Sequence, residues 1–229
     1  MAYLDILGIT DRIKSNKAAQ TESLNVLHNF YTHIIELSGS ESGINKYADI
    51  KFEIFSDNII IAKELSEHSQ VDDIAVLLNC VSNFLCFAVG DSVCWLVRGG
   101  VTVGYFYIDD MIVWGPALLR TYEIESKTAN YPRVILDYSV TNLLNSTNVD
   151  PEFILQDEDG MNYLNYMHIW HFSGLRVKNA FEHMKSEACR TDGTYPEKVL
   201  QKLCWHMKYI NHELNRKDEI KDRKYRLSI

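Results

Sequence analysis

The stretch FEIFSDNIIIA, residues 52–62, predicts two β-strands joined by a tight turn. Apolar residues lead up to Ser56, Asp57 and Asn58, and a second apolar run begins at Ile59. Serine, aspartate and asparagine are ordinary turn residues, because their short polar side chains hydrogen-bond to nearby backbone groups. Two interpretations of Asp57 therefore stay open: it serves the turn, or it is a carboxylate placed there for chemistry.

The hydrophobic pattern around this hairpin predicts the order β-α-β-β-α-β through Ser139. A short buried strand is expected in residues 2–10, and apolar residues at helical spacing predict helices in 18–37 and 71–89. Proline is tolerated in the first turn of a helix, so the Gly-Pro pair at 115–116 predicts another helix start. This order is the split β-α-β, ferredoxin-like pattern, and we expect an α+β fold with extra strands and a C-terminal helical extension.

Two parts of the chain are expected to differ in organisation. Residues 1–145 hold the β-α-β-β-α-β pattern, including a strand over 94–108 that we expect to bend at Gly99-Gly100. Residues 146–229 predict a polar hairpin and two helices, packed as an extension on the core.

Composition limits the function classes. The chain has 229 residues, of which 46% are hydrophobic and 24% charged, as in an ordinary globular protein. A net charge of −8 argues against a nucleic-acid partner. We find no apolar run of about 18 residues and no basic leader, so we expect neither a membrane span nor a signal peptide. Five cysteines without a CxxC pair favour the reducing cytoplasm.

Asp5 is the residue that the predicted fold brings to Asp57. In this topology the first strand lies beside the hairpin, although the two aspartates are 57 − 5 = 52 positions apart. Neighbouring carboxylates repel one another unless a cation lies between them. Mg²⁺ and Mn²⁺ prefer such oxygen ligands together with substrate phosphates. Asp5 and Asp57 therefore predict a site for a metal and a nucleotide.

A strand-to-helix turn follows Asp5 and contains Gly8. The backbone N–H groups at such a helix start can bind phosphate, so Gly8, Ile9 and Thr10 are candidate phosphate-binding residues. Arg98 lies on a predicted strand between apolar residues. Contact with phosphate and pairing with an acid are both open for this arginine.

Four segments resemble motifs of the class III nucleotidyl cyclases. YLDILGIT at 3–10 is similar to their first strand, and EIFSDN at 53–58 is similar to their hairpin, with Ser56 in place of the usual glycine. VRGGVTVG at 97–104 and IVWGPALLRTYEIES at 112–126 resemble a later strand and the helix start that follows it. The resemblance covers about residues 2–140.

The resemblance implies an enzyme that converts a nucleoside triphosphate to a 3′,5′-cyclic nucleotide and pyrophosphate. It implies two ions of Mg²⁺ or Mn²⁺, with Asp5, Ile6 and Asp57 as metal ligands. It also implies a homodimer with active sites at the interface. The apolar segment 101–114 is suited to such a partner surface.

The helix motif departs from the family pattern. Leu119 and Glu123 stand where familiar cyclases have the asparagine and arginine that hold the ribose and the transition state. Arg120, one turn before Glu123, is our candidate for the missing positive group and is counted with Asp5 and Asp57 as catalytic.

The expected base-binding residues are Glu53, Phe55 and Ile112. Ile112 replaces the polar partner that a purine reader would need, and bulky apolar side chains suit a smaller base. The altered positions resemble the uridylate and cytidylate cyclases of bacterial Pycsar anti-phage defence. We favour UTP over CTP, because no side chain here is an obvious donor to cytosine N3.

Other functions remain as alternatives. A purine cyclase that acts on ATP or GTP would reassign Glu53 as a purine reader. A cyclase-homology module without activity, which binds nucleotide or dimerises, would explain Leu119 and Glu123. The polymerase palm has the same core with two acids, but the acidic net charge and the absence of a basic or aromatic track speak against it.

Overall fold

The computed structural model describes residues 1–9, 14–38, 47, 49–90, 94–145, 151–169, 182–186 and 196–226. The chain divides into two compact units, Met1–Trp170 and His171–Ile229. Every candidate site residue belongs to the first unit.

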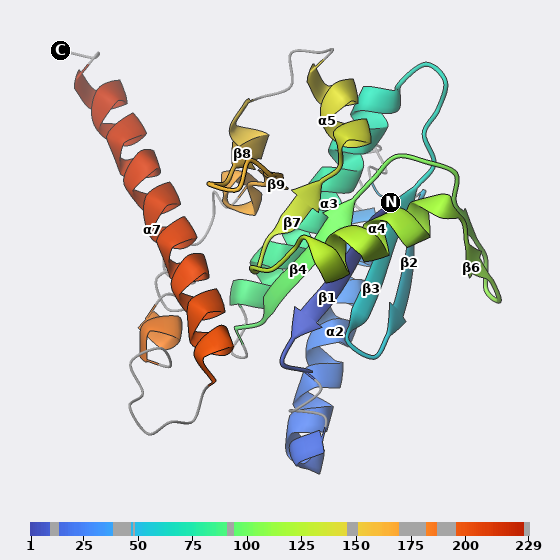
Figure 1. The fold of residues 1–229 in the computed structure, drawn as a ribbon, viewed down its shortest axis with the longest axis horizontal. Helices are drawn as coiled ribbons and strands as arrows, with labels where there is room; N and C mark the ends of the chain where they lie inside the picture. Colours follow the sequence, from blue (N-terminus) through green and yellow to red (C-terminus); the bar gives the residue numbers. More distant parts are fainter. Residues whose placement is uncertain are drawn as a thin grey trace. The chain divides into compact units, whose positions relative to one another are not determined.

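A mixed β-sheet forms the centre of the first unit (Figure 1). Among the described residues it has seven strands in the order β2-β3-β1-β4-β7-β9-β8. The strands are β1 (Ala2–Leu7), β2 (Ile50–Phe55), β3 (Asn58–Lys63), β4 (Leu96–Val101), β7 (Val134–Leu136), β8 (Ile154–Gln156) and β9 (Asn162–Leu164).

The first four strands have the ferredoxin-like arrangement that the sequence predicts. β3 is antiparallel to both β1 and β2, so β1 and β2 run in the same direction with β3 between them. β4 lies on the other side of β1 and is also antiparallel to it. The α+β fold class is confirmed, with strands β7, β9 and β8 added beyond β4.

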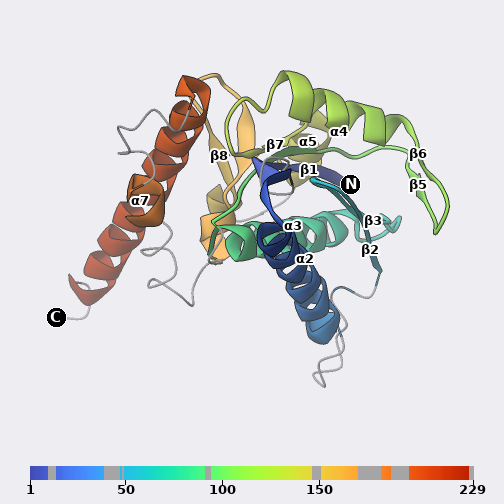
Figure 2. The same cartoon turned by 90° about the horizontal axis from the view of Figure 1, so that it is seen from below.

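Helices cover both faces of this sheet (Figure 2). Helices α2 (Lys17–Ser38) and α3 (Gln70–Gly90) lie on one face, and α4 (Pro116–Lys127) lies on the other. Side chains alternate between the two faces along each strand. On β1, Leu4 and Ile6 are buried on the side of α2 and α3, whereas Tyr3 and Asp5 belong to the side of α4.

One helix, α3, is long and apolar enough by length and composition to cross a membrane. This differs from the expectation that no segment would meet that criterion. In the described structure 56% of the apolar window is buried against the rest of the protein, as in a core helix. Its buried side chains include Ile74, Leu77, Leu78, Val81 and Phe84.

The expected long strand over 94–108 is wrong. β4 ends at Val101, and the chain then leaves the sheet to form a separate hairpin of β5 (Tyr107–Ile108) and β6 (Val113–Trp114). Gly99 and Gly100 are not a bend, because both lie within β4. They permit close packing instead, since a Cβ on Gly99 would lie 2.3 Å from the Tyr3 carbonyl oxygen.

The region after β7 contains a helix that the sequence reading missed, α5 (Tyr138–Asn145). The predicted hairpin around Asp159-Gly160 is β8 and β9, and β9 pairs with β7 in the main sheet. The first unit therefore extends to Trp170, beyond the expected boundary after residue 145. Two 3-10 turns flank the hairpin, η1 (Pro151–Phe153) and η2 (Tyr166–Ile169).

Arg133, just before β7, ties this hairpin to the core. Its buried guanidinium forms ion pairs with Asp157 and Asp159 at the turn between β8 and β9. Its backbone carbonyl accepts a hydrogen bond of 3.1 Å from the amide of Gly99 in β4. A buried charge is costly unless it is paired, so the arginine and the two aspartates stabilise this edge of the sheet together.

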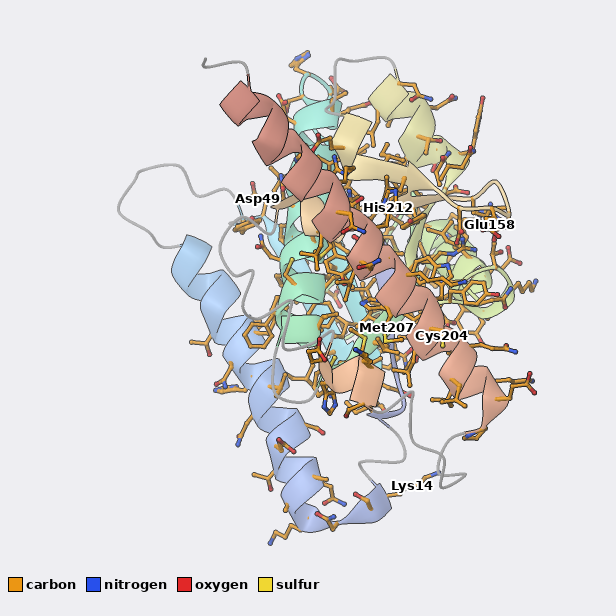
Figure 3. All side chains as sticks on the ribbon, turned by 90° about the vertical axis from the view of Figure 1, so that its left-hand side faces the viewer. Lys14, Asp49, Glu158, Cys204, Met207 and His212 are labelled. Atoms are coloured by element: carbon orange, nitrogen blue, oxygen red, sulfur yellow. The ribbon has the colours of Figure 1, made fainter. Side chains whose placement is uncertain are left out.

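The second unit contains α7 (Glu197–Arg226), which begins after Pro196 as predicted. Cys204, Met207 and His212 lie along this helix, and Glu158 marks the β8–β9 turn in the first unit (Figure 3).

Candidate functional site

The turn that carries Asp57 is a two-residue loop between β2 and β3. Phe55 and Asn58 face one another across the hairpin, so Ser56 and Asp57 form the turn. Ser56 has a φ of 58°, and a positive φ at the first turn residue alone is the pattern of a type II′ turn, which favours glycine there. Asn58 Nδ2 donates to Asp57 Oδ1 over 3.1 Å.

The structure brings Asp5 and Asp57 together at this turn. Asp5 lies on β1 directly opposite Asn58, the residue after Asp57. The amide of Ile6 donates to the carbonyl oxygen of Asp57 over 2.8 Å, which ties the end of β1 to the turn. Both aspartates are partly accessible to solvent. The fold thus places two carboxylates from distant parts of the sequence at one end of adjacent strands.

Tyr3 supports this pair of aspartates, and the sequence reading did not single it out. Its hydroxyl donates to Asn58 Oδ1 over 2.6 Å. Burial, followed by the nearby negative charges of Glu125, Asp5 and Asp57, raises the pKa of Tyr3 to about 12. The hydroxyl therefore stays protonated and holds Asn58 beside the turn. Tyr3 is two residues before Asp5 and so on the same face of β1, which was the available signal.

Arg98 is ion-paired with the candidate metal ligand Asp5. The two residues are opposite one another on β4 and β1, and Arg98 Nε lies 2.9 Å from Asp5 Oδ2. The same guanidinium lies 2.5 Å from Glu125 Oε1 through Nη2. Of the two interpretations that the sequence left open, this structure shows the pairing with an acid. Glu125 is a buried carboxylate that the sequence reading missed.

The residues present fit a divalent metal of the magnesium type. Mg²⁺ and Mn²⁺ are commonly held by one or two carboxylates, with substrate phosphates and water completing the coordination. Asp5 and Asp57 supply two carboxylates, and Ile6 can supply only its backbone carbonyl because its side chain is apolar and buried. Within the described residues no group of three or more His, Cys, Asp or Glu side chains forms a closed metal cage.

The predicted phosphate-binding turn is described in part. Gly8 is exposed, with a φ of +80°, and a Cβ there would meet no atom within 4 Å. Ile9 begins a helical turn and has a side chain 1% exposed, so only its backbone can face a ligand. Thr10 lies outside the described residues. The role of this turn in phosphate binding stays a prediction.

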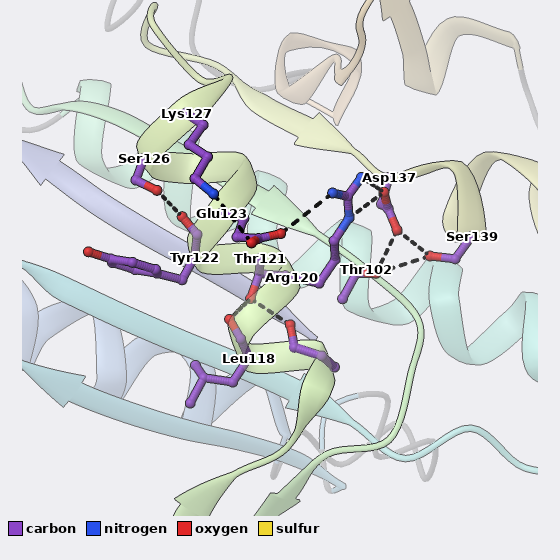
Figure 4. Close-up of polar contacts among 11 residues, drawn as sticks. Thr102, Leu118, Arg120, Thr121, Tyr122, Glu123, Ser126, Lys127, Asp137 and Ser139 are labelled. Atoms are coloured by element: carbon purple, nitrogen blue, oxygen red, sulfur yellow. Dashed lines mark hydrogen bonds and ion pairs between the residues drawn. The ribbon is translucent and has the colours of Figure 1, made fainter.

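Arg120 is paired with Asp137 in this chain (Figure 4). Its Nη2 and Nε lie 2.7 Å and 3.1 Å from Asp137 Oδ1. Thr102 also donates to this carboxylate. Burial opposes ionisation of Asp137, but hydrogen bonds from Arg120, Thr102 and Ser139 lower its pKa overall. The catalytic role of Arg120 remains a prediction.

The predicted base-binding residues lie on two elements, Glu53 and Phe55 on β2 and Ile112 in the β5–β6 hairpin. Glu53 is half-buried on β2 opposite Ile60, and Phe55, two positions on, is 45% exposed. Lys51 on the same strand donates to the carbonyl oxygen of Ile108 over 2.9 Å, so this side of β2 faces the hairpin. Ile112 is 52% exposed beside its turn.

No protein-family model and no curated protein matches this chain. Among solved structures the chain is similar to the crystal structure of the guanylyl cyclase Cya2, with 16% sequence identity and a TM-score of 0.40. That match covers 71% of this chain and 88% of the other.

Proposed function

We propose that this protein is a metal-dependent nucleotidyl cyclase. The observation that carries the proposal is the juxtaposition of Asp5 and Asp57, which the Ile6–Asp57 backbone hydrogen bond of 2.8 Å holds in place. Both carboxylates are partly exposed, so a cation can reach them from solvent. The motif resemblance over residues 2–140 supports the same reaction.

In the proposed reaction the ribose 3′ oxygen loses its proton and attacks the α-phosphorus, and the bond from that phosphorus to the pyrophosphate oxygen breaks. Bound Mg²⁺ or Mn²⁺ would make the 3′-hydroxyl more acidic and neutralise charge on the phosphates. The carboxylate oxygens of Asp5 and Asp57 would bind the cation. Tyr3, through Asn58, and Arg98 fix the positions of these aspartates.

We further propose that the substrate is a pyrimidine nucleoside triphosphate, with UTP favoured over CTP. Phe55 and Ile112 are exposed apolar residues that would contact the base, and the half-buried Glu53 would accept a hydrogen bond from uracil N3–H. The product would be a cyclic UMP messenger, and the resemblance to the Pycsar cyclases suggests a role in anti-phage defence in the cytoplasm.

A homodimer is part of this proposal, because the family that the motifs resemble forms its active sites between two catalytic domains. Arg120 is engaged by Asp137 in its own chain, where Nη2 lies 2.7 Å from Asp137 Oδ1. An apolar surface is exposed on the β5–β6 hairpin and the adjoining α4, where it is available to a second copy. We call this the hairpin surface; it consists of Tyr105, Tyr107, Met111, Ile112, Trp114, Leu119 and Tyr122.

A module without catalytic activity is the second candidate. It is favoured by Leu119, which is 68% exposed on α4 and has no polar group to hold a ribose. Nucleotide binding and dimerisation without turnover would then be the whole function.

One assay separates these candidates. The protein is incubated with Mn²⁺ and equal concentrations of UTP, CTP, ATP and GTP, and the products are identified by mass spectrometry. We expect cyclic UMP to predominate. Cyclic AMP or cyclic GMP as the main product would leave a purine cyclase, and the absence of any cyclic product would favour the module. Glu53→Gln should change the ratio of products if this residue reads the base.

A further inference from the structure

Arg98 lies between two carboxylates of different character. One is the partly exposed Asp5 on β1, and the other is the buried Glu125 on α4. We propose that Glu125 is a positioning residue that sets the metal affinity of Asp5 by drawing Arg98 away from it. This inference rests on the proposed function in one respect, the use of Asp5 as a metal ligand.

The contacts divide the guanidinium between its partners. Nε donates to Asp5 Oδ2 over 2.9 Å, Nη2 lies 2.5 Å from Glu125 Oε1, and Nη1 donates to the carbonyl oxygen of Ala129 over 3.5 Å. The Glu125 side chain is 6% exposed, compared with 16% for Asp5 and 24% for Arg98. The positive charge of Arg98 is therefore shared between Asp5 and Glu125, and Glu125 is the more strongly desolvated of the two carboxylates.

Close packing of α4 on β4 makes this sharing possible. Gly100 lies against the helix, and a Cβ there would be 2.7 Å from Ile124 Cγ2, next to Glu125 in sequence. Arg98 is two positions before Gly100 and on the same face of β4. Gly100 thus lets a helix carboxylate reach an arginine on the sheet.

Electrostatics gives the direction of the effect. A divalent cation at Asp5 competes with Arg98 for the same carboxylate, since both are positive. Glu125 favours the metal in two ways: it holds the guanidinium, and it adds a negative charge close to the site. Charge interactions are strengthened where the surroundings exclude water, as they do around Glu125. Removal of the Glu125 charge should therefore weaken metal binding, although Glu125 is not a ligand.

The test is isothermal titration with Mn²⁺ alone, without nucleotide, on the full chain. Glu125→Gln should bind Mn²⁺ about tenfold more weakly than the wild type, as is typical when a residue that supports a metal ligand is changed. Glu123→Gln is the matched control, because Glu123 is on the same helix but is exposed and pairs with Arg120 and Lys127. It should leave the affinity unchanged.

A double variant separates positioning from folding. Arg98→Met combined with Glu125→Gln removes the guanidinium that competes with the metal and the carboxylate that binds this guanidinium. Glu125 therefore leaves no buried charge without a partner. The double variant should bind Mn²⁺ at least as tightly as the wild type. A double variant as weak as Glu125→Gln would overturn the proposal, because the loss would then come from packing. Equal affinities of Glu125→Gln and wild type would also overturn it.

Folding and function are monitored separately. Thermal unfolding checks each variant, and if Glu125→Gln alone does not fold, the double variant carries the test. Wild-type protein that binds no Mn²⁺, or binds it equally well after Asp5→Asn, overturns this inference. Mn²⁺ binding that depends on Asp5, without any cyclic product, overturns the proposed function and leaves the inference about Glu125 standing.

Discussion

The amide of Ile6 donates to the carbonyl oxygen of Asp57 over 2.8 Å, which joins the end of β1 to the turn after β2. The bond places Asp5 and Asp57 at the same end of adjacent strands. It uses only backbone atoms, so substitution of either aspartate side chain leaves it intact. The chemistry of the two carboxylates can therefore be tested separately from the fold.

Asp57→Asn should reduce formation of cyclic nucleotide at least about a hundredfold, because the amide has no negative charge to offer a cation. Stability should change by less than about 0.5 kcal/mol, as for a typical surface substitution. Mass spectrometry of the product and urea unfolding measure the two effects. Asp49→Asn is the control, since Asp49 is an exposed aspartate just before β2. Full activity of Asp57→Asn would mean that Asp57 serves only the turn and is not a metal ligand.

Ser56→Gly should stabilise the first unit by about 1 kcal/mol, because a non-glycine residue with positive φ carries a steric cost that glycine avoids. The midpoint of urea unfolding measures this change. The same substitution at Ser126, inside α4, should have the opposite sign, since glycine disfavours a helix by about 0.5–1 kcal/mol. A lower midpoint for Ser56→Gly would mean that the serine side chain contributes to the turn.

Asp159→Asn should lower the melting temperature at pH 7. Hydrogen bonding to Arg133 holds the pKa of Asp159 below its ordinary value of 3.8. A carboxyl with a lowered folded-state pKa contributes stability above its unfolded-state pKa and loses it as the pH falls through the folded-state value. The difference between wild type and Asp159→Asn should therefore shrink below pH 3.8.

Calorimetry at pH 7 and at about pH 2 checks this dependence. Glu158→Gln, in the same turn, is the control and should show little effect at either pH. If the melting temperatures of wild type and Asp159→Asn differ by the same amount at both pH values, the Asp159 charge does not contribute to stability through Arg133.

Trp114→Glu should convert a homodimer into a monomer. Trp114 is 61% exposed at the end of β6 and packs edge-to-face with Tyr105, with ring centres 6.0 Å apart. A charge in the middle of the hairpin surface would have to be buried without a partner on dimerisation. Light scattering measures the mass in solution. Leu24→Glu on α2 is the matched control, because Leu24 is 66% exposed outside this surface. A wild-type monomer with full activity would contradict the dimer.

The sequence by itself determined the order of the elements from β1 to β4, with the helix start at Pro116, and the hairpin that carries Asp57. Both depend on local signals: alternating or helically spaced apolar residues, the Ser-Asp-Asn turn and the Gly-Pro helix start. The proximity of Asp5 and Asp57 followed from the same signals, because the ferredoxin-like order places β1 beside β3. Composition alone would not have joined these two residues.

Only the tertiary structure decided which partners the charged residues have. Arg98, Arg120 and Arg133 are each a cation beside apolar residues in the sequence, yet the first binds Asp5 and Glu125, the second Asp137, and the third Asp157 and Asp159. The Gly99-Gly100 pair was expected to bend a strand, and the structure shows that both glycines lie within β4 and permit close packing. These outcomes depend on how α4, β7 and the β8–β9 hairpin pack on the sheet. Pairing of buried charges is decided by distances across elements, and a linear sequence does not contain those distances.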